Sequence, residues 1–252
     1  MTLGFSAAVR SNDEAGPDQP TLSNRIGLIG GLALRAGVFY YEQILQRYNA
    51  HKKPLDLVLC HADVAKVLGH VGTGDRAGLG NYLGTLANEL FDAHAKLVAV
   101  TAVAPHLAIK EICQVARGAV VDALESIMPG FQAAGYRRVA IFGDRAVMQT
   151  HIFGAIPEKS VVRLEPSVID DIHTMYSDIA LQRKRGTKHE MEHLSRIARA
   201  LIEKQGAQAI VLAGTDLSSF YAEQKPDYPF LDTAQLHIEQ IMRLSQAADA
   251  LI

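Results

Sequence analysis

Short apolar runs alternate with amphipathic segments along most of the chain. Helical spacing of apolar residues follows each run, as in Tyr40, Ile44 and Tyr48. Alternation of strands and helices predicts parallel sheets that are covered by helices on both faces. The predicted strands are Arg25–Gly31, Leu55–Cys60, Lys96–His106 (which runs on into a polar turn), Val139–Gly143 and Ala209–Ala213.

The strand and helix pattern starts again near Arg138, which predicts two similar α/β halves with a ligand cleft between them. Residues 1–24 are polar and broken by Gly16, Pro17 and Pro20, so we expect a disordered tail there. We expect a first domain of residues 25–118 plus 232–252 and a second domain of residues 119–231.

The ends of the strands are the first places to look for chemistry, because open α/β sheets bind ligands beyond the carboxyl ends of their strands. This rule selects the turn at Gly30 and Gly31, His61 with Cys60, the stretch from Thr101 to His106, and Gly214 to Asp216. The Gly30 turn lacks the third glycine of the dinucleotide fingerprint, which argues against a nucleotide cofactor.

Composition narrows the class of protein. The 252 residues are 48% hydrophobic and carry a formal charge of −2, with no Lys/Arg run of the kind that binds nucleic acid. No apolar run approaches the ~18 residues that span a bilayer. The two cysteines, Cys60 and Cys113, indicate reduced thiols in a cytoplasm, and the scattered histidines do not have the spacing of a metal site.

Two further segments carry specific expectations. The glycine-rich stretch from Gly69 to Gly80 has the length of a lid or binding loop. The basic corner 183–186 is either a solvated helix end or a carboxylate clamp that uses Lys184. We expect Cys113 to be a buried structural residue of a helix.

Three motifs in order resemble the aspartate/glutamate racemase family. Ile26–Gly31 followed by Tyr40 and Tyr41 resembles its opening, Gly206–Asp216 resembles its second catalytic strand, and Phe230–Ala234 with His237 resembles its closing Asp-Thr segment. The similarity covers about residues 25–250.

The resemblance implies two pseudo-symmetric, Rossmann-like α/β domains with parallel sheets and an interdomain cleft that encloses a small carboxylic acid. It also implies a homodimer and no cofactor. In this family one cysteine thiolate removes the α-proton and a second thiol returns a proton from the opposite face, because the very weak carbon acid needs two groups that each change protonation state.

This chain departs from the family at both thiols. Counted back from His106, the first cysteine position is Ala102, and the Asn and Thr positions that follow are Val103 and Ala104. The second cysteine position is Gly214. Thr101 lies one residue off, and strand alternation points it to the other face.

Three hypotheses follow. The first, which we favour, is an enzyme with a repurposed site that performs isomerase or lyase chemistry on a small carboxylate or amino-acid-derived compound, as other members of this fold do. The second is a non-catalytic binder, and the third is a subunit beside an active paralogue. The candidate catalytic residues are His106, Asp216, Thr215 and His61. The candidate binding residues are Gly30, Gly31, Arg35, Cys60, Thr101, Ala102, Val103, Ala104, Lys184 and Gly214.

Overall fold

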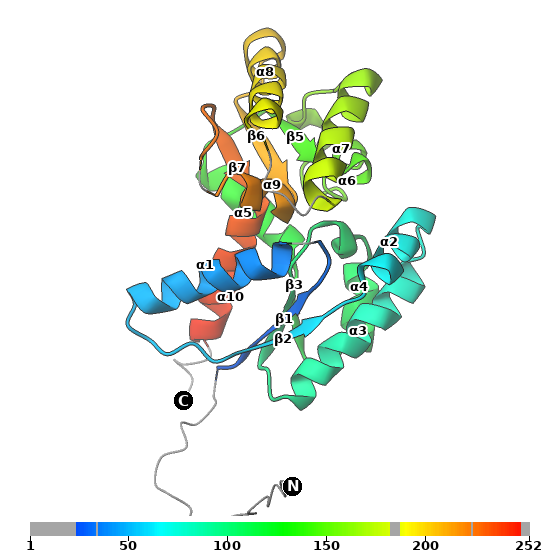
Figure 1. Ribbon diagram of the computed structural model, residues 1–252, viewed down its shortest axis with the longest axis vertical. Coiled ribbons are helices and arrows are strands. Elements are labelled where there is room, and N and C mark those ends of the chain that lie inside the picture. The colour runs from blue at the N-terminus through cyan, green and yellow to red at the C-terminus, as the bar shows by residue number, and fades with distance from the viewer. Residues whose placement is uncertain (1–23, 34, 182–186, 223, 248–252) are drawn as a thin grey trace, which may run out of the picture.

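The computed structural model describes residues 24–33, 35–181, 187–222 and 224–247. They form two α/β units stacked one above the other (Figure 1). Each unit is built on its own parallel sheet, as the alternating pattern predicts. Within these ranges, no helix is both long enough and apolar enough to cross a membrane.

The first sheet has the order β2-β1-β3-β4, and the second has the order β5-β6-β7. The strands of the first sheet are β1 (Ile26–Gly30), β2 (Leu57–His61), β3 (Leu97–Val100) and β4 (Ala119–Val121). Those of the second are β5 (Val139–Gly143), β6 (Ala209–Ala213) and β7 (Phe230–Asp232). The first sheet therefore extends beyond residue 118, where the expected first domain ends.

The helices of the first unit come mostly from the N-terminal part of the chain, whereas α10 follows the last strand. They are α1 (Ala36–Ala50), α2 (Val64–Thr73), α3 (Arg76–Asp92), the short 3₁₀ helix η1 (Ala104–Ala108), α4 (Ile109–Val115) and α10 (Thr233–Ala247). The others are α5 (Ala123–Ala133), α6 (Arg145–Gln149), η2 (Glu158–Ser160), α7 (Pro166–Leu181), α8 (Lys188–Gln205) and α9 (Thr215–Phe220).

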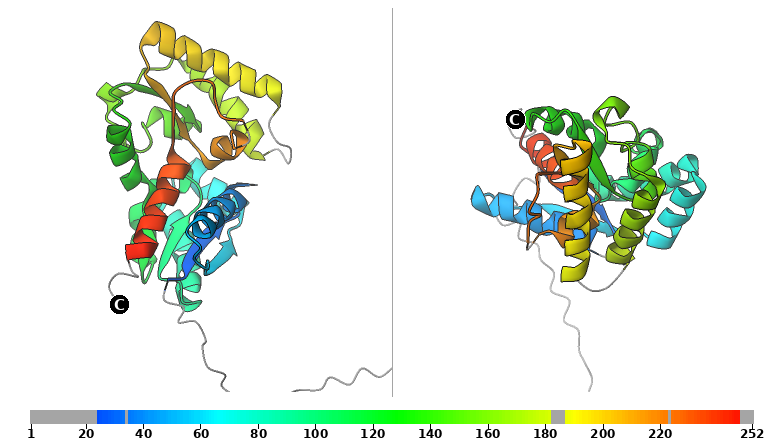
Figure 2. Two further views of the ribbon diagram at one scale, coloured as in Figure 1. Left: turned by 90° about the vertical axis from the view of Figure 1, so that its left-hand side faces the viewer. Right: turned by 90° about the horizontal axis from the view of Figure 1, so that it is seen from above.

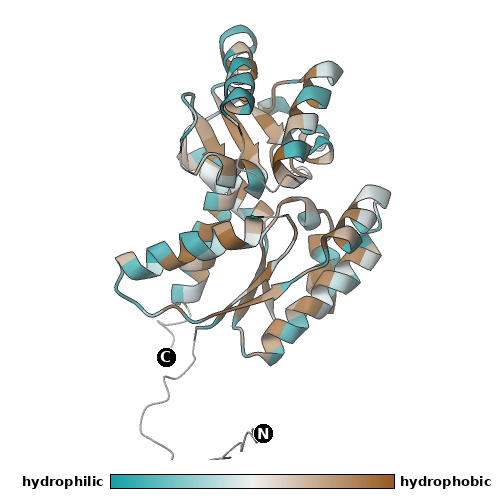
Figure 3. Ribbon diagram, in the orientation of Figure 1, coloured by the Kyte–Doolittle hydropathy of each residue, from teal (hydrophilic) through white to brown (hydrophobic). Residues whose placement is uncertain are grey.

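Strand alternation sorts the core of the first unit into two layers. On β3, Leu97 and Ala99 pack with α1 and α10, whereas Val98 and Val100 pack with α2, α3 and α4. Successive strand residues point to opposite faces, so each face of the buried sheet is covered by its own helices. The strands are correspondingly apolar in both sheets (Figure 3).

The two units are joined by contacts as well as by chain crossings. Helix α10 leaves the second sheet and runs down beside the first unit (Figure 2), where it packs against α1. Val103, which follows β3, packs into the core of the second unit. The Thr215 hydroxyl donates a hydrogen bond of 2.9 Å to the Thr101 carbonyl. These contacts bring the ends of β3 and β6 together.

Two local expectations are wrong. The glycine-rich stretch from Gly69 to Gly80 is not a loop: α2 ends at Gly74, which adopts a left-handed conformation, and α3 begins directly after Asp75. Asp75 caps α3 through a hydrogen bond from the Gly78 amide. Cys113 lies on α4 as expected, but it is exposed rather than buried.

Candidate functional site

A cavity of about 570 Å³ lies where the two units meet. Its wall takes residues from the ends of β1, β2 and β3 in the first unit and from the residues after β5 and β6 in the second. The carboxyl ends of both sheets therefore face the same space, as the rule for ligand sites in open α/β sheets requires.

Six residues that the sequence selects line this cavity. They are Gly30, Gly31, His61, Ala102, Ala104 and Asp216. Gly31 adopts φ 77°, and a Cβ on it would come within 2.7 Å of the His61 ring. A glycine is required here both for the left-handed turn and for the space that the imidazole occupies.

The carboxyl group of Asp216 is the most perturbed acid of the cavity wall. Asp216 is the second residue of α9, close after the end of β6, and is only 6% exposed. Burial raises its pKa to about 6, although a hydrogen bond from the Tyr176 hydroxyl, at 3.2 Å, acts in the opposite direction. A carboxyl group with this pKa changes protonation state near neutral pH, as a general acid or base must.

Tyr176 occupies the space beside Gly214. A Cβ built on Gly214 would lie 2.5 Å from Cε2 and 2.7 Å from the hydroxyl of Tyr176. Contacts this short do not occur between real atoms, so no side chain fits at residue 214 unless the tyrosine moves. The phenol that occupies this space donates a hydrogen bond to Asp216.

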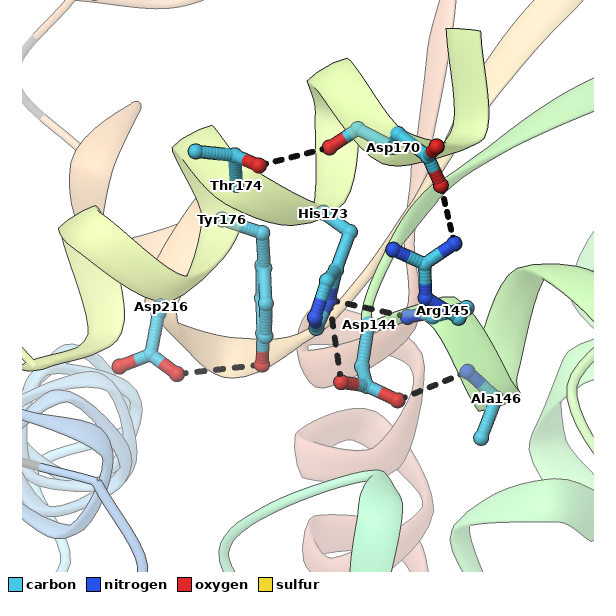
Figure 4. A network of polar contacts seen from close by, with 8 residues as sticks. All are labelled: Asp144, Arg145, Ala146, Asp170, His173, Thr174, Tyr176 and Asp216. Atoms are coloured by element: carbon cyan, nitrogen blue, oxygen red, sulfur yellow. Dashed lines mark hydrogen bonds and ion pairs between the residues drawn. The ribbon is translucent and has the colours of Figure 1, made fainter. Parts of the chain in front are cut away.

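A second acidic residue, Asp144, lines the cavity next to this pair. It follows β5, accepts a hydrogen bond of 2.8 Å from the Ala146 amide, and so caps α6. Its other oxygen lies 3.3 Å from Nδ1 of His173. His173 and Tyr176 are one turn apart on α7 and extend from the same side of the helix (Figure 4). Burial is the main cause of the raised pKa of Tyr176, and the negative charges of Asp216 and Asp144 raise it further.

The structure places three other candidates away from the cavity wall. His106 is 1% exposed, its Nδ1 lies 2.8 Å from the Ala102 carbonyl oxygen, and its ring packs edge-on against His237. Thr101 and Thr215 both donate their hydroxyl hydrogens to backbone carbonyls. The two threonine hydroxyls thus connect the ends of neighbouring strands. The chemical roles expected of His106, Thr101 and Thr215 remain predictions.

The remaining candidates are also scattered. Cys60 packs on the α3 side of the sheet, because its neighbours Leu59 and His61 take the cavity side. Val103 is buried in the second core, and Gly214 is covered by Tyr176. Arg35 lines a neighbouring cavity of about 680 Å³, and Asp216 also lines that cavity. Lys184 lies outside the described residues.

Sequence reasoning missed Asp144, Tyr176 and the apolar residues of α2. Asp144 carries the signal used for the other sites, a polar residue directly after a strand, and could have been found. Tyr176 carries no such signal, because an aromatic residue within an amphipathic helix is typical of a core position. Among the described residues, no group of three or more His, Cys, Asp or Glu side chains is placed to hold a metal ion.

A sequence comparison identifies one family, and solved structures share its fold. The sequence model of the family described as Asp/Glu/Hydantoin racemase matches residues 29–241. A search of curated proteins finds no match. Among solved structures, an aspartate racemase homologue from Pyrococcus horikoshii is 19% identical, with a TM-score of 0.72 over 88% of this chain and 99% of that one.

Two further structures share the fold at low identity. Aspartate racemase from Picrophilus torridus is 14% identical, with a TM-score of 0.70 over 88% of this chain and 94% of that one. Glutamate racemase from Francisella tularensis, in complex with D-glutamate, is 16% identical, with a TM-score of 0.58 over 90% of this chain and 83% of that one. At these identities the structures establish the two-domain α/β fold.

Proposed function

This chain belongs to the Asp/Glu/Hydantoin racemase family, and we propose that it is a cofactor-independent enzyme that moves a proton at a carbon atom of a small carboxylate or amino-acid-derived compound. The reaction is of the isomerase or lyase type and does not use two thiols. The observation that carries the proposal is the buried Asp216 carboxyl on the cavity wall, with its pKa raised to about 6 by burial.

The proton-transfer groups in this proposal come from both units. Asp216 acts as the acid or base of the second unit, and the Tyr176 hydroxyl orients its carboxyl group through their hydrogen bond. His61, the last residue of β2, lines the same cavity and supplies a second group. A reaction that removes a proton from one face of a carbon and returns one to another needs two such groups.

The thiol route has no support in the arrangement of side chains. Ala102 and Gly214 stand at the two thiol positions of the resembled family, and neither can exchange a proton. Burial, with a contribution from Glu89, raises the pKa of the Cys60 thiol to about 11, so Cys60 stays protonated near neutral pH. Cys113 is on α4, away from the cavity wall.

The cavity wall favours a less polar compound than aspartate. Most of its residues are apolar, and none of the described residues that line it is Lys or Arg. The family description names hydantoin beside aspartate and glutamate, and a hydantoin carries no free carboxylate. An amino-acid derivative with a masked carboxyl group and an apolar substituent therefore suits this cavity better than a dicarboxylic acid does.

Isotope exchange tests the proposal. The protein is incubated in deuterated water with phenylalaninamide, 5-benzylhydantoin, 2-phenylpropionate and phenylmalonate, and NMR follows deuterium at the α-carbon and loss of carboxylate. We expect one of these compounds to exchange or decarboxylate above the protein-free rate. Binding without any conversion across the panel would instead support the alternative, a non-catalytic binder or a partner subunit, either of which would retain the cavity.

A further inference from the structure

The cavity has two chemically different ends. One end is apolar and is formed largely by α2, where Val64, Val67, Leu68 and Val71 lie on one face at helical spacing. Val64 and Leu68 are 37% and 51% exposed, although apolar side chains of this size are usually buried. Large apolar side chains that remain exposed around a cavity indicate an apolar group of a ligand.

The other end is acidic. Gly143 and Ala213 are paired in the second sheet, so Asp144 and Gly214, the residues that follow them, begin their turns side by side. Asp144 and Asp216 thus flank the hydroxyl of Tyr176 (Figure 4). No Lys or Arg stands among the described residues of this wall, so within this part of the chain the carboxylates face no ammonium or guanidinium group.

Among the neighbouring side chains, the imidazole of His173 lies 3.3 Å from Asp144 and carries a charge only when it is protonated. The backbone N–H of Arg145 points to Nδ1 of His173 at 3.3 Å. Nδ1 of His173 is therefore shared between the Arg145 amide and the Asp144 carboxylate, and the tautomer of the ring decides which of the two contacts is a hydrogen bond. The Arg145 guanidinium is paired with Asp170 outside the cavity. A carboxylate on a largely apolar wall, with an imidazole beside it rather than a Lys or Arg, is stabilised further when a cation arrives.

We propose that the cavity binds a hydrophobic primary amine, with its ammonium group between Asp144 and Tyr176 and its apolar substituent against α2. The inference rests on the proposed function only for the location of the site. An ammonium group has three donors, which Asp144 and the hydroxyl oxygen of Tyr176 can accept, and the face of the tyrosine ring attracts the same charge. Asp216 then remains free to act on the carbon that carries the nitrogen.

Three probes with one skeleton test the charge preference. Isothermal titration at pH 8 compares 2-phenylethylamine, 2-phenylethanol and 3-phenylpropionate with the full-length protein. We expect the amine to bind at least tenfold more tightly than the alcohol and the acid to bind most weakly. Tighter binding of the acid than of the amine, or no binding of the amine, would overturn the proposal, whether or not the protein catalyses exchange of any compound.

Asp144→Asn provides the decisive variant, because asparagine also caps helices and so preserves the start of α6. Its matched control is Asp122→Asn, which removes one charge from the cap of α5, where the carboxylate accepts a hydrogen bond of 2.8 Å from the Leu124 amide. Asp144→Asn should abolish the advantage of the amine over the alcohol and leave alcohol binding unchanged, whereas Asp122→Asn should preserve both. An amine preference that survives Asp144→Asn would contradict the assignment.

Discussion

The ring of Tyr176 fills the space into which a side chain on Gly214 would extend. The Cβ position of Gly214 is 2.5 Å from Cε2 of the tyrosine, and the same tyrosine donates a hydrogen bond to Asp216 two residues later. The backbone of Gly214 is extended, with φ 177°, so the glycine is required by the tyrosine and not by a strained turn. Tyrosine and glycine together define this end of the cavity.

Gly214→Ala should therefore lower the free energy of unfolding by on the order of 1 kcal/mol, because the ring must move and lose its hydrogen bond. In a Tyr176→Ala background the same change should cost much less. Urea denaturation of the four proteins measures this coupling. Gly69→Ala is the control, since a Cβ on Gly69 of α2 meets nothing within 4 Å. Equal costs in both backgrounds would show that Tyr176 does not fill this space.

Asp216 should make stability depend on pH. Its pKa is raised on folding to about 6, so the folded state favours the protonated form, and the stabilisation present at pH 4 is lost as the pH rises through 6. Asp216→Asn removes this dependence. Between pH 4 and 7 its free energy of unfolding should therefore rise relative to that of the wild type, by up to about 3 kcal/mol. Urea denaturation at several pH values tests this. A constant difference between the two proteins would contradict it.

Other ionisable groups line the two cavities to which Asp216 belongs. Tyr176, Asp144 and His61 share its cavity, and Arg35, Glu42 and Lys188 line the neighbouring one. Tyr176→Phe isolates the contribution of the tyrosine, because it removes the hydroxyl whose hydrogen bond lowers the pKa of Asp216 and leaves the other groups in place. The pKa measured by NMR should therefore rise further in this variant.

Aspartate and glutamate should not exchange their α-protons on this protein. Our proposal places Ala102 and Gly214, which lack a sulfur atom, at the two thiol positions, and the described residues of the cavity wall include no Lys or Arg for a second carboxylate. Incubation of each enantiomer in deuterated water should give no α-deuterium above the protein-free rate. Rapid exchange at neutral pH would show that Ala102 and Gly214 do not stand at the thiol positions.

Cys60 and Cys113 should be dispensable for chemistry. Cys113 is exposed, so Cys113→Ala should change stability by less than about 0.5 kcal/mol. Cys60 packs against the α3 layer, so Cys60→Ala should cost more, on the order of 1 kcal/mol. Neither change should reduce exchange of a substrate found with the panel. A loss of exchange in either variant would indicate a thiol mechanism.

The sequence predicts β1, β2, β3, β5 and β6 and the edge where the site lies, because apolar runs such as Leu97–Val100 end in polar turns whatever packs around them. It misses the two three-residue strands β4 and β7, which are too short to form an apolar run. The sequence-based prediction fails where close packing between helices determines the local structure. The stretch that ends at Gly80 suggests a loop, yet Gly80 belongs to α3, where a Cβ on it would meet Glu111 at 2.3 Å and one on Gly84 would meet Val115 at 2.6 Å. These glycines allow α3 and α4 to approach closely, and that contact offsets their weak helix propensity.

The candidate site divides in the same way. His61 ends β2 and Asp216 comes shortly after β6. Their positions near the cavity could therefore be predicted from the places where the apolar runs end. His106 also follows a strand, but η1 turns its ring into the buried layer against His237. Tyr176 arrives from α7, distant in sequence, and only the packing of α7 against the second sheet brings it to Gly214. Residues placed by long-range packing leave no local signal.

The most direct test of proton transfer by Asp216 is the rate of α-deuterium incorporation by the wild type and by Asp216→Asn, measured side by side on the panel compound that exchanges fastest. Asparagine keeps an acceptor for the Tyr176 hydroxyl but cannot take up a proton at neutral pH. We predict at least a hundredfold slower exchange in the variant, with the dissociation constant of the compound within about threefold of the wild type. Equal exchange rates in the two proteins would contradict the account.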